Sequence, residues 1–201
     1  MHLQAYIFVS DKVPVDISRT NNGAAIRNAI VAGNLAEVKR LLRRTNTKNP
    51  VISYGDTAGY RGRPAGGFDN PVTALEFSAQ EGKLDIYRGI SAELTNINPG
   101  SRSGSMKGRT PMHAASNNGH LHIVKYISNC LFDKNPKTIN NASPLHSAAW
   151  SGQLEVVRYL TNFNRNLDQK TNSFWNFGTP VQFAADNGHT DVLNFLNSKR
   201  G

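Results

Sequence analysis

Apolar and polar residues are arranged along this chain in a pattern that recurs five times. The stretch "SPLHSAAWSGQLEVVRYL", which begins at Ser143, shows the unit as two short segments separated by a glycine. In the second segment Leu154 and Val157 are three residues apart, and Val156 and Leu160 are four apart. Apolar residues at these spacings share one face of a helix. Two such short helices cannot bury their faces alone, but neighbours stacked in an array can.

The other copies confirm that this is an internal repeat. They are "AAIRNAIVAGNLAEVKRL", "TALEFSAQEGKLDIYRGI", "TPMHAASNNGHLHIVKYI" and "TPVQFAADNGHTDVLNFL", which begin at residues 24, 73, 110 and 179. In every copy a glycine lies nine positions after the first residue, and these glycines are 49, 37, 33 and 36 residues apart. A period near 33 residues with occasional insertions indicates a repeat array.

Each position of the unit has a physical reason. A Thr or Ser at the start can cap a helix, because its oxygen accepts a backbone N–H that has no partner within the helix. Proline follows at the first helical turn, where its missing N–H costs nothing. The small Ala/Ser pair lets a neighbouring helix approach closely, and the glycine ends the helix in the left-handed conformation. The sequence therefore predicts a helix, a turn and a second helix in each unit.

The sequence resembles the ankyrin repeat family, whose pattern is about 33 residues long and begins T-P-L-H-x-A. The resemblance covers residues 24–199 and is strongest from 110 to 196. The first unit lacks the Thr-Pro start, and the second has Ala74 in place of proline and Glu76 in place of histidine. The resemblance implies an all-α solenoid of about five helix-turn-helix repeats with β-turn fingers, and a role in recognition.

The spacing of the units sets the domain organisation. We expect a non-repeat segment at 1–23, which contains the apolar "LQAYIFVS", followed by the repeat domain at 24–199. Residues 46–71 are rich in Gly, Pro and Asn, so we expect a flexible insertion there. A second loop is expected at 98–108, and an extended finger at 164–178 carries Trp175 and Phe177.

The histidines raise the question of a metal or catalytic site. His113, His120, His122, His146 and Cys130 lie within 34 residues of one another. However, His113 and His146 occupy the same position of successive units, where the family resemblance implies a structural histidine bonded to backbone. Zinc-module spacing, a nucleophile elbow and a phosphate loop are all absent from the sequence. We therefore expect no catalytic, metal-binding or cofactor-binding residues, and a protein that is not an enzyme.

The expected function is to bind a partner protein through the concave groove and the fingers, as the resemblance implies. The two positions before each glycine are expected to face this groove, and Trp150 stands where other units have Val, Gln, Asn and Asp. Tryptophan is enriched in binding hot spots. The expected contact residues are Lys107, Arg109, Asn117, Asn118, Trp150, Ser151, Trp175, Phe177, Asp186 and Asn187.

The composition of the chain suggests an alternative function and a cellular location. The formal net charge is +9, which favours an acidic partner. A basic patch of Lys39, Arg40, Arg43 and Arg44, together with "YRGRPAGG" in the insertion, leaves nucleic-acid or acidic-surface binding as the alternative. A targeting role beside an enzyme in a longer chain is also open. A single cysteine favours an intracellular location, cytoplasmic or nuclear, and no stretch is apolar for long enough to be a transmembrane helix. We expect a monomer.

Overall fold

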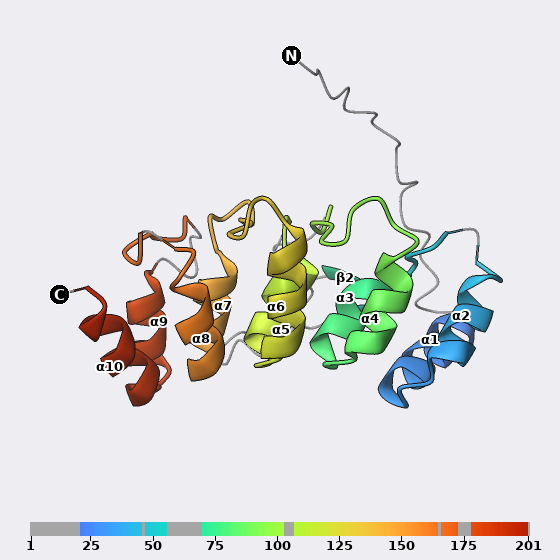
Figure 1. The fold of residues 1–201 in the computed structure, drawn as a ribbon, viewed down its shortest axis with the longest axis horizontal. Coiled ribbons are helices and arrows are strands. Elements are labelled where there is room, and N and C mark those ends of the chain that lie inside the picture. Colours follow the sequence, from blue (N-terminus) through green and yellow to red (C-terminus); the bar gives the residue numbers. More distant parts are fainter. Residues whose placement is uncertain are drawn as a thin grey trace, which may run out of the picture.

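The computed structural model describes residues 21–45, 47–55, 70–102, 107–164, 166–172 and 178–200. Within these residues ten helices follow one another as five pairs (Figure 1). The pairs are α1 (Asn21–Val31) and α2 (Leu35–Leu42), α3 (Ala74–Gln80) and α4 (Leu84–Ser91), α5 (Pro111–Asn117) and α6 (Leu121–Cys130), α7 (Pro144–Trp150) and α8 (Leu154–Leu160), and α9 (Pro180–Asp186) and α10 (Thr190–Ser198). The predicted all-α solenoid is confirmed.

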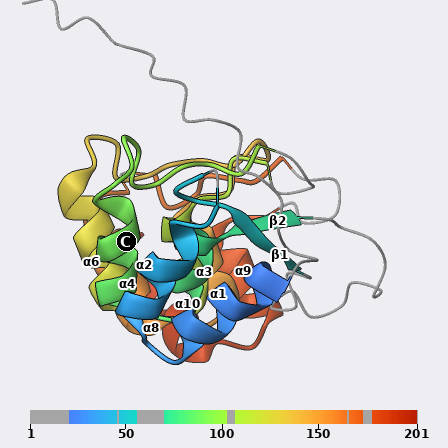
Figure 2. The ribbon, with the colours of Figure 1, turned by 90° about the vertical axis from the view of Figure 1, so that its right-hand side faces the viewer.

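The helices form two layers along the array. The inner layer contains α1, α3, α5, α7 and α9, each of which contacts the next inner helix. The outer layer contains α2, α4, α6, α8 and α10, which lie on one side of the inner helices (Figure 2). Apolar side chains from both layers, such as Ile30, Leu75, Met112, Leu145 and Leu196, form one continuous core through all five units.

Residues at the start of each unit cap the inner helices. The Thr73 hydroxyl accepts a hydrogen bond from the Glu76 backbone N–H, and the Thr179 hydroxyl does the same for Gln182. Helices α5, α7 and α9 each have proline in the first turn. The first unit has no Thr-Pro, and its helix α1 begins at Asn21, three residues before the start that the repeat pattern suggests.

The repeat glycines end the inner helices in the left-handed region. Their φ angles lie between 69° at Gly82 and Gly152 and 77° at Gly119. Residues with a Cβ rarely adopt such angles, because the Cβ crowds the following carbonyl oxygen. This turn reverses the chain and sends the second helix of each unit into the outer layer.

The expected flexible insertion at 46–71 has regular structure at its two ends. Strand β1 (Val51–Gly55) pairs antiparallel with strand β2 (Asn70–Thr73), on the side away from the outer helices (Figure 2). Val51, Ile52 and Val72 are buried, so burial of β-branched side chains stabilises this hairpin. Residues 56–69, like the N-terminal residues 1–20, lie outside the described parts of the chain.

Candidate interaction surface

His113 and His146 have the same structural role in successive units. The Nδ1 atom of His113 accepts a hydrogen bond from the Thr110 backbone N–H at 3.2 Å, and its Nε2 lies 3.1 Å from the Ala142 carbonyl oxygen. His146 repeats this arrangement with Ser143 at 3.2 Å and with the Gln169 carbonyl at 2.9 Å. A carbonyl oxygen can only accept, so Nε2 carries the proton in both rings. Each histidine therefore caps its own helix and ties it to the next finger.

Burial keeps both imidazoles neutral. Desolvation lowers the pKa of His113 to about 3 and that of His146 to about 4, against the weaker opposite effect of their hydrogen bonds to backbone carbonyls. Both nitrogens of each ring are already in use, so neither ring can ligate a metal without breaking these bonds. Among the described residues, no group of three or more His, Cys, Asp or Glu side chains could hold a metal ion. Cys130 is exposed at the end of α6.

Other residue types fill the same position in the remaining units. In the last unit the Gln182 Oε1 accepts from the Thr179 backbone N–H at 2.8 Å. In the first unit Arg27 donates to the Ile52 carbonyl in the hairpin. In the second unit Glu76 is buried, and burial raises its pKa although Arg109 acts in the opposite direction. Its carboxylate pairs with the Arg109 guanidinium, with Oε1 and Nη1 3.3 Å apart.

A second set of side chains connects each of units three to five with the unit before it. In these units the residue after the repeat glycine reaches back to a backbone carbonyl at the end of the preceding inner helix. His120 Nε2 donates to the Gln80 carbonyl at 2.8 Å, and His189 Nε2 donates to the Trp150 carbonyl at 2.9 Å. Gln153 makes the equivalent, longer bond, at 3.4 Å, to the Asn117 carbonyl. The ends of these inner helices are thereby fixed relative to the next unit.

Trp150 is partly exposed and packs against the following unit. Its ring meets the Phe183 ring edge-to-face, with centroids 5.3 Å apart and planes at 81°. The same Phe183 ring also meets His146, at a centroid distance of 5.8 Å. This contact with α9 fixes the orientation of the indole, and Trp150 remains partly exposed.

The polar residues expected beside Trp150 lie at the ends of α5, α7 and α9, and each is at least partly exposed. Ser151 Oγ donates to Asn117 Oδ1 at 2.8 Å, which links two neighbouring units. Asn118 and Asn187 each donate their side-chain amide to the carbonyl four residues before, at 2.9 Å and 2.8 Å. We call Asn117, Asn118, Trp150, Ser151, Asp186 and Asn187 the inner strip.

The expected contact residues near the fingers have different environments. The Arg109 side chain is only 11% exposed, and it is paired with Glu76 between two units. Lys107 is exposed, and its carbonyl accepts from the Ile139 backbone N–H of the next finger at 2.8 Å. Trp175 and Phe177 lie outside the described residues.

The basic patch of the first unit is divided. Arg40 makes two hydrogen bonds of 2.6 Å to the Glu37 carboxylate, and this interaction lowers the pKa of Glu37. Lys39 and Arg43 line a pocket beside α4, and Arg44 is exposed. These four cations therefore do not act as one uniform surface, and the "YRGRPAGG" segment of the insertion lies outside the described residues.

The fold and the side-chain contacts between units together define the class of protein to which this chain belongs. Five stacked helix pairs with repeated turns, caps and carbonyl links make a helical repeat solenoid, a class whose extended surfaces bind other molecules. Residues 75–172 match the family model for ankyrin repeats, in three copies. This central part of the chain belongs to the ankyrin repeat family, whose members generally serve as protein–protein interaction modules.

A search of the curated proteins finds no significant match to the sequence. In the described part of the chain, no helix has both the length and the apolar composition needed to cross a membrane.

Proposed function

We propose that this protein is a non-enzymatic adaptor that holds a partner protein against the inner strip. The observation that carries the proposal is Trp150, a partly exposed indole at the centre of a row of polar side chains. Lys107, on a neighbouring finger, would add positive charge and favour an acidic partner. Arg109 is left out of the contact surface because its charge is already paired with Glu76.

The environment of Trp150 suits a binding hot spot. Its ring is held edge-on by Phe183, and its carbonyl is bonded by His189. A side chain that is already ordered loses less conformational entropy when a partner binds. Tryptophan at the centre of an interface, surrounded by groups that exclude water, commonly contributes more than its neighbours. Trp150 is therefore the residue on which we expect affinity to depend most.

The polar members of the inner strip would supply direction. The side-chain amide nitrogens of Asn118 and Asn187 bond their own helices, which leaves the Oδ1 atoms available to accept from a partner. Asp186 is exposed at the end of α9 and can accept from backbone N–H groups or pair with a cation. Such side chains fit an extended polypeptide that places one apolar side chain on Trp150.

The test begins with affinity capture on the full chain, followed by calorimetric titration of the purified captured protein. Trp150→Ala should raise the Kd by at least fivefold, which corresponds to about 1 kcal/mol. Since this change also removes packing on Phe183, Asp186→Arg serves as a second variant that disturbs no described contact. Asp85→Arg, on the exposed face of outer helix α4, is the matched control and should leave the Kd unchanged.

Equal affinities for the wild type, Trp150→Ala and Asp186→Arg would exclude the inner strip as the binding surface. A loss of affinity with Asp85→Arg alone would indicate that the partner binds the outer helices instead.

A further inference from the structure

The outer helices carry a repeated pairing of a cation with an aromatic ring of the next unit. The cation stands fifteen residues after the start of its unit, and the ring sixteen residues after the start of the following one. The pairs are Arg88 over Tyr126, with the guanidinium carbon 4.9 Å from the ring centroid, Lys125 over Tyr159, with Nζ at 5.7 Å, and Arg158 over Phe195, with the guanidinium carbon at 4.7 Å. This series therefore spans the outer face of units two to five.

The first interface has the cation but not the ring. Lys39 is the residue of unit one that corresponds to Arg88, and Gly89 takes the place of the ring in unit two. The two residues are in register, because a Cβ added to Gly89 would lie 3.4 Å from the Lys39 Cε. In the described part of the chain, the Lys39 ammonium makes no hydrogen bond or ion pair.

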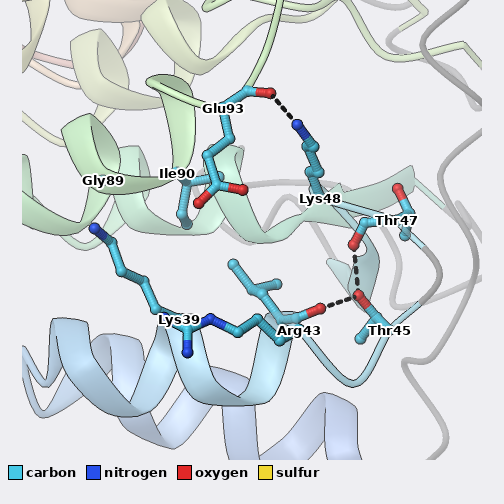
Figure 3. Close-up of a pocket in the computed structure, with 9 residues that line it drawn as sticks. Lys39, Arg43, Thr45, Thr47, Lys48, Gly89, Ile90 and Glu93 are labelled. Carbon is cyan, nitrogen blue, oxygen red and sulfur yellow. Dashed lines mark hydrogen bonds between the residues drawn. The ribbon is translucent and has the colours of Figure 1, made fainter.

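A pocket of about 310 Å³ lies at this interface. That volume is at the lower end of the range of ligand pockets, about 300–1,000 Å³, and can accommodate an aromatic side chain. Figure 3 shows Lys39 on α2, Arg43 just after the end of α2, and Ile90 and Glu93 on the α4 side. The remaining lining residues are Leu42, Thr45, Thr47, Lys48 and Gly89.

Backbone conformation does not require a glycine at position 89. Gly89 lies inside α4 and is not among the glycines with positive φ. A glycine in a helix interior costs about 1 kcal/mol relative to alanine. An added Cβ would meet Leu35 Cδ1 at 2.5 Å, and this atom is the end of a flexible side chain that can move. The main consequence of Gly89 is therefore the volume that its missing side chain leaves open.

The charges around the pocket favour an anionic ligand. Of the described residues that line it, Lys39, Arg43 and Lys48 are basic and Glu93 alone is acidic. The Lys48 ammonium donates to the Glu93 backbone carbonyl at 3.1 Å, which fixes its position at the rim. A carboxylate entering beside Arg43 could form a charge-assisted, bidentate hydrogen bond with the guanidinium. Apolar contact is available from Leu42 and Ile90.

We propose that this pocket binds an aromatic side chain of a partner segment in which acidic residues flank the aromatic residue. The ring would lie against Lys39, as Tyr126 lies against Arg88, and a flanking carboxylate would pair with Arg43. The pocket lies between outer helices, whereas the inner strip lies at the ends of inner helices. The proposal therefore describes a second binding surface and does not depend on the first.

The probe is a capped pentapeptide with phenylalanine between two glutamates on each side, titrated into the ¹⁵N-labelled full chain. We expect saturable shifts of the amide signals of Gly89 and its neighbours. A peptide with alanine in place of phenylalanine should bind at least fivefold more weakly, because it lacks both the cation–π contact and the buried ring. Binding of the phenylalanine peptide should also weaken as salt screens the charges.

Two pairs of variants locate the site. Gly89→Phe would fill the pocket with the chain's own ring and should weaken peptide binding at least tenfold. Gly89→Ala displaces the same Leu35 atom but leaves the pocket open, so its affinity should stay within about twofold of the wild type. Lys39→Gln should weaken binding. Lys125→Gln should not, because the Lys125 ammonium already lies over the Tyr159 ring. Thermal unfolding of each variant checks that it is folded.

Equal binding of the phenylalanine and alanine peptides would overturn the proposal, because the surface would then recognise charge alone. Undiminished binding to Lys39→Gln, or to a folded Gly89→Phe variant, would overturn it as well.

Discussion

The Arg109 guanidinium forms an ion pair with the Glu76 carboxylate across the interface between units two and three, with 3.3 Å between Nη1 and Oε1. In the next unit the residue that corresponds to Glu76 is His113, which donates to the carbonyl of Ala142, the residue that corresponds to Arg109. An ionised carboxylate cannot donate a hydrogen bond, so a carboxylate at this position needs a cationic or donor group on the facing unit. Arg109 provides that group. The Glu76–Arg109 ion pair therefore takes the place of the histidine–carbonyl hydrogen bond that units three and four make to the following finger.

Removing Arg109 should destabilise the array strongly. Arg109→Ala leaves a buried carboxylate without its ion partner, and breaking one side of such a pair typically costs about 3 kcal/mol or more. Urea-induced unfolding of the variant and the wild type at pH 7 measures the difference.

The double change Glu76→His with Arg109→Ala provides the control. It places a histidine opposite a backbone carbonyl, as in units three and four, and should recover most of the lost stability. A double variant no more stable than Arg109→Ala alone would show that the histidine and the ion pair are not equivalent.

Acidification should weaken the fold through the two buried histidines. The folded pKa values of His113 and His146, about 3 and about 4, lie below the unfolded value of about 6.5. Below pH 6.5 the unfolded chain therefore binds protons that the folded chain does not. Stability is complete above that pH and is lost toward pH 4, by up to about 1.4 kcal/mol per pH unit for each histidine. Chemical unfolding at several pH values gives the slope.

The last unit suggests the matched variant for this experiment. Gln182 makes the same cap with its side-chain oxygen and does not titrate in this range. His113→Gln combined with His146→Gln should therefore reduce the slope between pH 6.5 and 4. Identical slopes in the variant and the wild type would mean that other groups cause the pH dependence.

Two repeat glycines with similar backbone angles should respond differently to alanine. Gly82 has φ 69° and Gly188 has φ 74°, so both changes incur the left-handed penalty of about 1 kcal/mol. A Cβ at Gly82 would also meet His120 Cε1 at 2.7 Å, whereas no atom of the described residues lies within 4 Å of one at Gly188. Gly82→Ala should lower the melting temperature more than Gly188→Ala, and equal losses would show that His120 moves aside without cost.

Ser116 offers a stabilising change. Its hydroxyl is buried in α5 and has no hydrogen-bond partner among the described residues, and the corresponding residues in the neighbouring units are Ala79 and Ala149. Burying a hydroxyl without a partner costs about 1 kcal/mol or more. Ser116→Ala should therefore raise the free energy of unfolding, and a decrease would indicate that the hydroxyl has a partner in solution.

Much of the fold follows from short-range signals in the sequence. Thr110, Pro111 and Gly119 mark the start and end of an inner helix, because capping, proline placement and left-handed turns depend on a few neighbouring residues. The hairpin was missed because the burial of Ile52 and Val72 depends on helices elsewhere in the chain. Residue pairings at such distances are not visible in local composition.

The candidate surfaces depended on contacts that cross units. The sequence predicts Arg109 as a contact residue because it adds positive charge beside the groove. Its pairing with Glu76 is not visible in the sequence, because Glu76 lies in the preceding unit and looks like a simple departure from the repeat. Glu76 and Arg109 stand at positions that face each other across the interface of units two and three, and their opposite charges are the one sequence signal for this ion pair. Aligned units also show that Lys39 and Gly89 stand where Arg88 and Tyr126 stand one interface later, which marks the pocket.

The histidine and glutamine links between units end on backbone carbonyls, as at Gln80, Trp150 and Ala142. Every residue type has a carbonyl, so the accepting position places no demand on the side chain there. A unit with such links is portable: it can be copied, or set beside a different neighbour, without a matching substitution. The Glu76–Arg109 pair is different, because either residue transplanted alone would carry an unmatched charge into the stack.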